Sequence, residues 1–367
     1  MKNYLVFEIQ NSLSLSNELL NESKILIYKG DIMKILCYGV IKSEIPVFKK
    51  ANEPYNNELI FKSELLNDEN VNDLPEGLDA IVLFVNCDAN AKNLQFFKNK
   101  GVKYIVTRTA GFDHIDLPVA KKLGYKIGRV PAYSPTAVAS LGFAAGVSML
   151  RKTAYICNQT ANRNFKIDNS MLAKEFRNSV IGIIGTGKIG YETAKYWASV
   201  GATVLGYDIY ENEKSKEYLV YTDLDTLLTK SDLVSLHIPY IKGQNEKFVN
   251  AKLISKMKNG ATLINVARKN LVDLEAVCKA VKDNKLWGYA ADVFDYEERL
   301  IHKSFDSDQL REIVPVLEEA IELYPRILIT PHIAYLTDEA VKNMAEVSFA
   351  NLQQLVETET CDNLIPE

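Results

Sequence analysis

The stretch Val180-Ile181-Gly182-Ile183-Ile184-Gly185-Thr186-Gly187-Lys188-Ile189-Gly190 decides the fold of this chain. Its β-branched first half predicts a short buried strand, and the apolar spacing from Ile189 to Val200 predicts a helix. Between them lies the pattern G-x-G-x-x-G. In a strand–turn–helix, Gly185 permits a tight turn, Gly187 lets the backbone approach a pyrophosphate, and Gly190 lets the helix pack close to the sheet. The sequence therefore predicts phosphate binding at the helix N-terminus, with a plain glycine-rich turn as the simpler alternative.

Asp208 narrows the ligand of this loop. It follows a second predicted strand, 202–207, and lies 18 residues beyond Gly190. A carboxylate at about this spacing hydrogen-bonds the ribose hydroxyls of a dinucleotide. The next residues, Ile209-Tyr210-Glu211, supply no arginine for a 2′-phosphate, and the negative charge here would repel one. We therefore expect NAD rather than NADP. The loop and this acid give the first cofactor-binding residues: Gly185, Thr186, Gly187, Lys188, Ile189, Gly190 and Asp208.

Composition excludes several other classes of protein. The chain is 47% hydrophobic and 25% charged with a net charge of −4, which is globular and gives no basic surface for nucleic acid or membrane. We find neither an apolar run of the roughly 20 residues that span a bilayer nor a signal peptide. The five cysteines are scattered, without metal-ligand spacing, so we expect no disulfide and no metal. A soluble, cytoplasmic protein is the expectation.

Residues 1–32 form an extension of doubtful structure. They are polar and weakly patterned, whereas the run from Met33 to Val40 predicts a first strand. One hypothesis is that Met33 is the true start, because Lys29-Gly30-Asp31 could be encoded by AAA-GGA-GAT, which resembles a bacterial ribosome-binding site. The alternative is a genuine extension that packs poorly. N-terminal sequencing of the native protein would decide, and an intact Met1 would reject the hypothesis.

At 367 residues the chain is too long for one ordinary core, so we predict two domains. Strands alternate with helices from Met33 onward, which predicts an α/β fold of two Rossmann-like parallel sheets, the first flavodoxin-like, with a cleft between them. The first domain comprises 33–132 plus 332–367, because a final helix at 337–356 returns to it. The NAD-binding domain comprises 133–331. The predicted strands are 33–40, 80–85, 103–107, 180–184, 202–207, 233–237, 261–266, 288–293 and 327–330, and the other predicted helices are 90–100, 114–123 and 136–152.

Four blocks of sequence occur in a specific order and spacing. They are R-T-A-G-F-D-H-I-D at 108–116 with V-P-A-Y-S-P at 130–135, the glycine loop with Asp208, L-I-N-V-A-R-K-N-L-V-D at 263–273 with A-D-V-F at 291–294, and T-P-H-I-A-Y at 330–335. Together they make the chain similar to the D-isomer specific 2-hydroxyacid dehydrogenases, in particular to their D-lactate dehydrogenase-like branch. The resemblance covers roughly residues 33–356, and the long segment 297–326 favours that branch.

The resemblance implies a catalytic set of Arg268, Glu297 and His332. Arg268 would pair with the substrate carboxylate and polarise the C2 carbonyl, for which a planar guanidinium is suited. His332 would protonate the oxygen when a keto acid is reduced and remove that proton in reverse, and a histidine exchanges protons near neutrality. Glu297 would hydrogen-bond the other ring nitrogen and favour the charged imidazole. Taken without this context, an arginine or histidine at a strand end would more often be structural.

The resemblance also implies further contacts. Asp292 would contact the nicotinamide carboxamide, and the backbone N–H groups of Ala110 and Gly111 would hold the substrate carboxylate. Further cofactor neighbours would be His237, Pro239, Val266 and Ala267, and the substrate pocket would add Phe84, Tyr133 and Tyr335. The histidines His114, His237 and His302 are interpreted as structural or surface residues, with the cofactor contact as the alternative for His237, whose strand end borders the cofactor in relatives.

Three residues depart from the family pattern. Lys269 stands where relatives usually have glycine after the catalytic arginine, Ser140 replaces part of a usual Glu-His pair at the start of the helix 136–152, and Arg129 replaces a common asparagine. The first could reshape the turn or add a positive charge near the nicotinamide. The second puts the interface of that helix in doubt.

The bulk of Phe84, Tyr133 and Tyr335 suits a short keto acid, so the expected reaction is reversible reduction of pyruvate to D-lactate with NADH. A roomier pocket for larger branched or aromatic acids, as in 2-hydroxyisocaproate or phenyllactate formation, is one alternative, since a pocket discriminates by only about 1–3 kcal/mol per methylene. An NAD(H)-sensing, corepressor-like binding protein is another. A homodimer is expected from the family and from the small residues of helix 136–152. The preferred acid and the physiological direction stay open.

Overall fold

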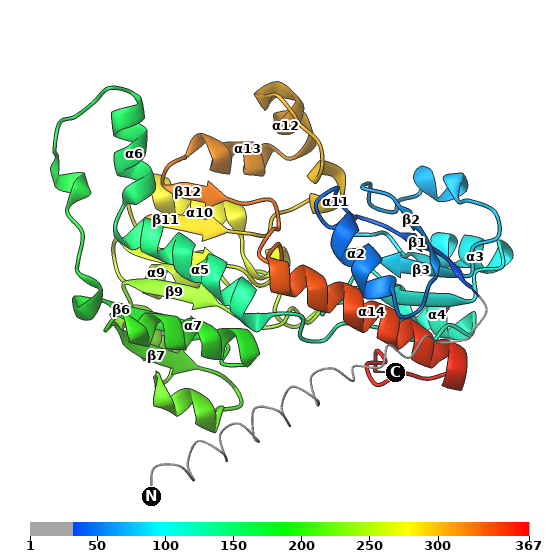
Figure 1. The fold of residues 1–367 in the computed structure, drawn as a ribbon. Coiled ribbons are helices and arrows are strands. Elements are labelled where there is room, and N and C mark those ends of the chain that lie inside the picture. The colour runs from blue at the N-terminus through cyan, green and yellow to red at the C-terminus, as the bar shows by residue number, and fades with distance from the viewer. Residues whose placement is uncertain (1–31, 367) are drawn as a thin grey trace, which may run out of the picture.

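The computed structural model describes residues 32–366 as two lobes, each built on its own parallel β-sheet (Figure 1). The proposed late start and the extension at 1–32 therefore lie outside the described residues, apart from Ile32. The two lobes agree with the predicted fold class of two doubly wound sheets. Each lobe contributes residues to one cavity between them.

The first sheet has the strand order β2-β1-β3-β4-β5, the flavodoxin-like order. Its strands are β1 (Lys34–Cys37), β2 (Glu58–Phe61), β3 (Ala80–Leu83), β4 (Tyr104–Thr107) and β5 (Ile127–Gly128), all parallel. The predicted first strand is too long, because Gly39 turns the chain with a φ of +66°. Sequence analysis missed β2 and β5. The first is a partly exposed edge strand and the second is only two residues long, so neither shows a clear apolar run.

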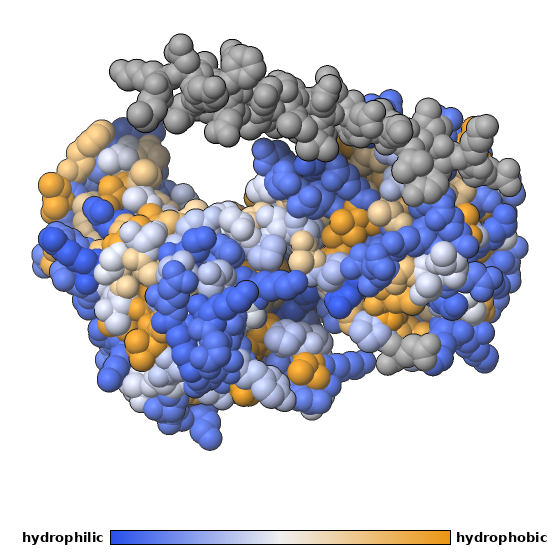
Figure 2. Space-filling view, turned by 60° about the horizontal axis from the view of Figure 1, so that its bottom comes forward, coloured by the Kyte–Doolittle hydropathy of each residue, from blue (hydrophilic) through white to orange (hydrophobic). Residues whose placement is uncertain are grey.

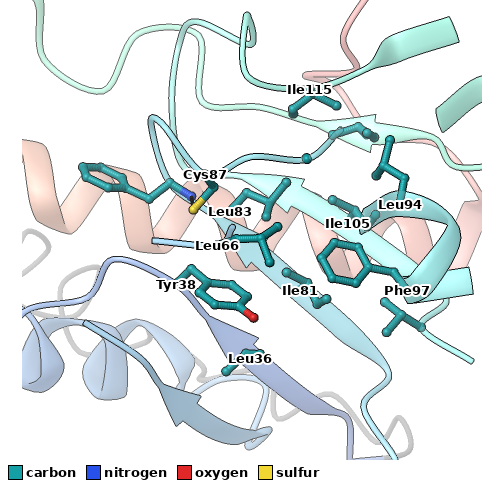
Figure 3. Packing of buried hydrophobic residues seen from close by; sticks show 14 of the residues in the cluster. Leu36, Tyr38, Leu66, Ile81, Leu83, Cys87, Leu94, Phe97, Ile105 and Ile115 are labelled. Atoms are coloured by element: carbon teal, nitrogen blue, oxygen red, sulfur yellow. Dashed lines mark hydrogen bonds between the residues drawn. The ribbon is translucent and has the colours of Figure 1, made fainter. Parts of the chain in front are cut away.

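Helices on both faces of this sheet complete the first lobe. They are α2 (Ile45–Asn52), α3 (Ala91–Asn99) and α4 (Leu117–Lys122), with a 3-10 turn η1 (Asn70–Asp73). Figure 3 shows the core on one face, where Leu36, Ile81 and Ile105 of the strands meet Leu94 and Phe97 of α3. The predicted helix 114–123 is wrong in its first turn. The side chain of Asp116 accepts a hydrogen bond from the backbone N–H of Val119 and so caps the helix there.

The second sheet has the order β12-β11-β10-β9-β6-β7-β8, again all parallel. Its strands are β6 (Val180–Ile184), β7 (Thr203–Tyr207), β8 (Val220–Tyr221), β9 (Leu233–Leu236), β10 (Ala261–Asn265), β11 (Leu286–Ala291) and β12 (Ile327–Ile329). The six predicted strands are present with ends shifted by at most two residues, and β8, which is only two residues long, was missed. The chain order reverses between β6 and β9, which is the switch point where doubly wound sheets bind ligands.

Helices cover both faces of the second sheet (Figure 1). The helices of this lobe are α5 (Pro135–Leu150), α6 (Thr153–Ala161), α7 (Lys188–Ser199), α8 (Leu224–Lys230), α9 (Ala251–Lys256), α10 (Leu274–Lys282), α11 (Glu297–Leu300), α12 (Ser307–Ile313) and α13 (Pro315–Glu322), of which α12 packs on α13. Short 3-10 turns are η2 (Asn169–Met171), η3 (Phe176–Asn178), η4 (Glu213–Glu217) and η5 (Lys269–Leu271).

Helix α5 packs closely within the subunit. Two of its small residues lie against neighbouring elements of the same chain, and the dimer that these small residues were taken to support stays a prediction. A methyl group on Gly142 would press on Val266, and one on Gly146 would collide with Trp197. The stripe of small residues therefore lets α5 lie close to α7 and to the sheet.

The last helix, α14 (Asp338–Thr358), leaves the second lobe and packs on α2 and β4 of the first (Figure 1). Beyond it, Leu364 pairs with Gly128 at the edge of the first sheet. Among the described residues, no helix combines the length and apolarity that crossing a membrane requires. The face in Figure 2 mixes hydrophilic residues with separate hydrophobic patches on both lobes, as globular proteins do.

Candidate active site

The glycine loop has the geometry that its sequence predicts. Gly185 has a φ of +92°, and a side chain there would lie 2.6 Å from the carbonyl carbon of His237, so only glycine fits between β6 and β9. A methyl group on Gly190 would collide with the carbonyl oxygen of Gly185. Gly187, by contrast, faces open space at the N-terminus of α7. The loop thus leaves a bare backbone where a pyrophosphate can bind.

Asp208 lies across from this loop at the end of β7. One carboxylate oxygen accepts hydrogen bonds from the backbone N–H of Thr186 at 2.6 Å and from its hydroxyl at 3.2 Å. The other oxygen accepts the backbone N–H of Tyr210. The acid is therefore fixed beside the loop, as a ribose-binding carboxylate must be.

Arg268 projects from the end of β10 toward the first lobe. Its Nε lies 3.2 Å from Oδ2 of Asp113, and a methyl group on Gly111 would collide with its Nη2. The guanidinium thus lies directly against the backbone at 110–111, the segment predicted to hold the substrate carboxylate. Its Nη1 also donates to the carbonyl oxygen of Ala267 at 2.8 Å, which fixes the plane of the fork.

His332 and Glu297 form a hydrogen-bonded pair. Nδ1 of His332 lies 2.6 Å from Oε2 of Glu297, and the glutamate is only 2% exposed. Burial acts to raise the pKa of Glu297, but the nearby His332 and several hydrogen-bond donors outweigh it and hold that pKa below its ordinary range. An ionised carboxylate only accepts, so Nδ1 carries a proton and Nε2 remains for proton exchange in the cavity.

Asp292 has a role that sequence reasoning did not foresee. Its carboxylate accepts the hydroxyl of Thr330 at 2.6 Å and the backbone N–H groups of Ile333 and Ala334 at 2.9 and 2.8 Å. These bonds hold the turn that carries His332, whose backbone has a left-handed φ of +52°. Burial raises the pKa of Asp292 despite these donors. Asp292 also lines the cavity, as predicted for a nicotinamide contact.

The floor of the cavity is aromatic. The rings of Phe84 and Tyr335 meet edge to face with centroids 4.9 Å apart, and they are 3% and 7% exposed. Behind Phe84, the guanidinium of Arg108 lies 3.8 Å from the ring centroid. Arg108 is fully buried and ion-paired with Glu44 at 2.7 Å. This backing holds the floor closed.

The cavity between the lobes has a volume of about 190 Å³ and gathers most of the predicted catalytic and substrate residues. The predicted residues that line it are Phe84, Ala110, Gly111, Tyr133, Ile189, Val266, Arg268, Asp292, Glu297, His332 and Tyr335. The predicted residues outside its lining are Gly185, Thr186, Gly187, Lys188, Gly190, Asp208, His237, Pro239 and Ala267. Most of the second group belongs to the glycine loop and its surroundings at the switch point.

Burial lowers the pKa of two further histidines, His114 and His237. His114, interpreted as structural, in fact lines the cavity, and burial lowers its pKa to about 4. The ring of His237 turns inward, with Nε2 2.9 Å from the hydroxyl of Ser235, and burial lowers its pKa to about 3. Only the backbone of His237 approaches the glycine loop. These lowered pKa values disfavour the imidazolium form of either ring near neutral pH.

Sequence reasoning missed several lining residues, among them Asn86, Asp113 and Met344. Asp113 lies within a quoted block and could have been proposed from its charge beside the substrate segment. Asn86 and Met344 carry no comparable signal, since they reach the cavity only through the packing of β3 and α14.

The structure accounts for the three departures. Lys269 lines the cavity and pairs with Glu298 at 3.3 Å, which joins the turn after Arg268 to α11. Arg129 donates to the carbonyl oxygen of Ala110 at 2.9 Å and so supports the substrate segment. Ser140 bonds back to the carbonyl oxygen of Ala137 within α5. The predicted catalytic residues Arg268, Glu297 and His332 line the cavity beside them.

Comparisons with known proteins agree with this geometry. Residues 143–334 match the family model described as D-isomer specific 2-hydroxyacid dehydrogenase, NAD binding domain. The chain is 36% identical over 335 residues to an aromatic 2-oxoacid reductase of Clostridium sporogenes, covering 90% of this chain and 98% of the relative. It is also 36% identical over 339 residues to a D-lactate dehydrogenase of Lactiplantibacillus plantarum, and this match covers 91% of this chain and 99% of the relative. The crystal structure of a D-lactate dehydrogenase from Treponema pallidum matches with a TM-score of 0.79 at 31% identity, covering 91% of this chain and all of that one.

Two parallel α/β sheets, a dinucleotide loop at the switch point and an acid–base pair in the cavity between the lobes define an NAD-dependent dehydrogenase. The chain belongs to the D-isomer specific 2-hydroxyacid dehydrogenase family, in its D-lactate dehydrogenase branch. It is therefore an oxidoreductase that acts on D-2-hydroxy acids with NAD.

Proposed function

We propose that pyruvate is the preferred substrate and that the enzyme interconverts pyruvate and D-lactate. The closed aromatic floor carries this proposal. Phe84 and Tyr335 are in contact, Arg108 supports Phe84 from behind, and a side chain on Gly39 would already touch the Phe84 ring. A floor packed from behind cannot retreat at low cost, because dense interiors resist displacement. A methyl group at C3 of the substrate suits it better than a benzyl group.

In this proposal Arg268 binds the substrate carboxylate with its fork and polarises the C2 carbonyl. The N–H groups of Ala110 and Gly111 complete the carboxylate site, and their closeness to the guanidinium supports that assignment. Tyr133 closes the side of the pocket. Together these groups hold the keto acid in one orientation, which lowers the entropic part of the barrier.

His332 delivers the proton to the C2 oxygen from Nε2 and takes it back in lactate oxidation. Its Nδ1 bond to the buried Glu297 fixes the ring and stabilises the imidazolium that the reduction consumes. NADH, when bound, supplies the hydride for C2. The glycine loop fits its pyrophosphate, because Gly187 opens onto free space while Gly185 and Gly190 are closely packed.

The remaining cofactor contacts are proposed from where the residues lie relative to the glycine loop and the cavity. Asp208 would bind the adenosine ribose, while Lys188 and Ile189 begin α7 beside the phosphates. Val266 and Asp292 line the cavity and would contact the nicotinamide. The other proposed neighbours are Thr186, Ala267, Pro239 and the backbone of His237.

Aromatic 2-oxoacids are the second candidate substrates. The relative from Clostridium sporogenes is named an aromatic 2-oxoacid reductase and is as similar in sequence as the D-lactate dehydrogenase from Lactiplantibacillus plantarum. Val138 and Met344 also line the cavity. An unbranched methionine adapts its shape more readily than other apolar residues, so this side could accommodate a ring.

A steady-state panel of pyruvate, 2-ketoisocaproate and phenylpyruvate with NADH and NADPH tests the proposal. We expect the highest kcat/KM for pyruvate with NADH. In Phe84→Leu the preference should move toward phenylpyruvate by about 10-fold, the scale at which one or two methylenes discriminate. Phenylpyruvate outperforming pyruvate in the wild type would replace the first candidate with the second.

We also propose the division into a substrate domain, 33–132 plus 332–367, and an NAD-binding domain, 133–331, together with a cytoplasmic location and a homodimer. The homodimer is supported by the segment between α6 and β6, where Phe165, Ile167 and Leu172 are 78%, 91% and 81% exposed. Exposed apolar side chains on one segment are typical of an interaction surface. Light scattering of the purified protein would measure the subunit number.

A further inference from the structure

The carboxylate of Glu297 has a donor that the proton-transfer pair does not explain. Nδ2 of Asn86 lies 2.6 Å from Oε2 of Glu297, the same oxygen that lies 2.6 Å from Nδ1 of His332. The other oxygen, Oε1, accepts the backbone N–H of Phe294 at 2.8 Å. Three donors therefore surround one buried carboxylate.

The direction of each of these hydrogen bonds is fixed by the charge of Glu297. An ionised carboxylate can only accept, so the asparagine must present its NH₂ group and the imidazole its Nδ1–H. Hydrogen bonds to an ionised group are the strong ones, and they lose strength when the carboxylate rotates. Two donors on Oε2 and one on Oε1 leave Glu297 a single orientation.

Asn86 reaches Glu297 from the other lobe. It follows β3 in a tight turn in which the N–H of Cys87 bonds to the carbonyl oxygen of Phe84 at 3.1 Å. Its φ is +64°, a left-handed conformation that asparagine and glycine adopt more readily than other residues. Glu297 belongs to α11 of the second lobe. The bond therefore crosses the cavity and joins the substrate floor at Phe84 to the acid–base pair.

We infer that Asn86 is a positioning residue: from the substrate side of the cavity it holds the Glu297 carboxylate in the orientation that supports His332. The inference rests on the proposed roles of Glu297 and His332. Phe84 lies two residues before Asn86 in the same turn. This turn therefore supplies both the floor of the substrate pocket and a donor to the acid–base pair. The pair thus depends on the two lobes being together.

The charges around Glu297 define what a pH profile should report. Asp295 and Glu298 are its acidic neighbours in the chain, Lys269 faces them from η5, and His332 and Asp292 lie on the strand side. Burial raises the pKa of Glu297, while His332 and then the donors, Asn86 among them, lower it. Loss of the Asn86 donor should therefore move the acidic limb of kcat/KM to higher pH.

The test compares two left-handed asparagines. Asn86→Gly removes the amide but keeps the turn unstrained, and Asn56→Gly makes the same change at an exposed residue with a φ of +55°. We expect kcat for Asn86→Gly to fall about 10- to 100-fold, the scale of one bond to an ionised group, with an unchanged Kd for NADH. Asn56→Gly should match the wild type. Asn86→Asp keeps the side-chain size and the turn but replaces the amide donor with a second negative charge beside Glu297. Its kcat should therefore fall further than that of Asn86→Gly.

A double variant with Glu297→Gln distinguishes the role of Asn86 from the role of Glu297. If Asn86 acts through Glu297, adding Asn86→Gly to that variant should change kcat less than twofold. A wild-type kcat for Asn86→Gly, or an equal loss in both backgrounds, would overturn the inference while Glu297 keeps its role. A wild-type kcat for Glu297→Gln would overturn the proposed role of Glu297 and the inference with it.

Discussion

The glycine loop after β6 takes its shape from consecutive residues, whereas the cluster around Glu297 joins three segments from two lobes. In the loop, the left-handed φ of Gly185 and the close approach of Gly190 to its carbonyl oxygen are local constraints. In the cluster, Glu297 meets His332 and Asn86 only because β3, β11 and β12 end at one cavity. Binding of the cofactor thus depends on local backbone geometry, and chemistry depends on tertiary convergence.

Arg268→Ala should give the largest effect, because it removes the charged group at the point of convergence. Loss of a bidentate partner for the substrate carboxylate should lower kcat/KM for pyruvate on the order of 10³-fold. Arg268→Lys should recover only part of it, since an ammonium cannot reproduce the planar fork. Steady-state kinetics measures both variants, and near-wild-type activity in Arg268→Ala would remove the carboxylate site from this position.

Glu297→Gln should lower kcat about 100-fold with little change in the Kd for NADH. Although burial raises the pKa of Glu297, His332 and the donors hold it below the ordinary value of about 4.3. A depressed glutamate pKa adds stability above about pH 4.3 that is lost as pH falls through the folded-state pKa. Denaturant unfolding between pH 3 and 7 should therefore show a shallower pH dependence in Glu297→Gln. An identical pH dependence in both proteins would contradict the depressed pKa.

Two glycine variants sharpen the other side of the comparison. Gly187→Ala adds a methyl group into open space, so the melting temperature should stay within about 2 °C of the wild type, while NADH affinity falls about 10-fold as the pyrophosphate is obstructed. In Gly190→Ala the added methyl group presses on the Gly185 carbonyl oxygen, so both the melting temperature and the NADH affinity should fall. Calorimetry and NADH fluorescence titration separate these outcomes. Equal loss of stability in both variants would mean that Gly187 is not open.

Asp113→Asn should give the smallest effect. Asp113 is paired with Arg268 at 3.2 Å, but its side chain is 56% exposed, and exposed pairs contribute little. Because Asp113 competes with the substrate carboxylate for the guanidinium, the KM for pyruvate should fall by about two- to threefold at low salt, and the difference should shrink as salt screens the pair. A rise in KM would instead make Asp113 a support for Arg268.

Sequence patterns predicted the second lobe better than the first. All six strands predicted there are present, because buried parallel strands read as clear apolar runs. In the first lobe β2 and β5 were missed, since an edge strand and a two-residue strand show no such run. The start of α4 was misplaced because Asp116, inside a quoted block, is also its cap. In α5, Gly142 and Gly146 pack on Val266 and Trp197, while the dimer that its small residues were taken to support stays a prediction.

The sequence by itself predicted the dinucleotide loop and the acid at Asp208, because both belong to a short strand–turn–helix motif whose geometry is local, and the resemblance to the family supplied the proposed roles of Arg268, Glu297 and His332. Only the tertiary structure decided that Asn86 bonds to Glu297, that Asp292 holds the turn of His332 and that Arg108 supports Phe84. The physical reason is the distance along the chain over which each kind of interaction acts. Backbone preferences act over a few neighbouring residues, whereas these contacts join residues whose separation along the chain is closed only by packing of the two sheets.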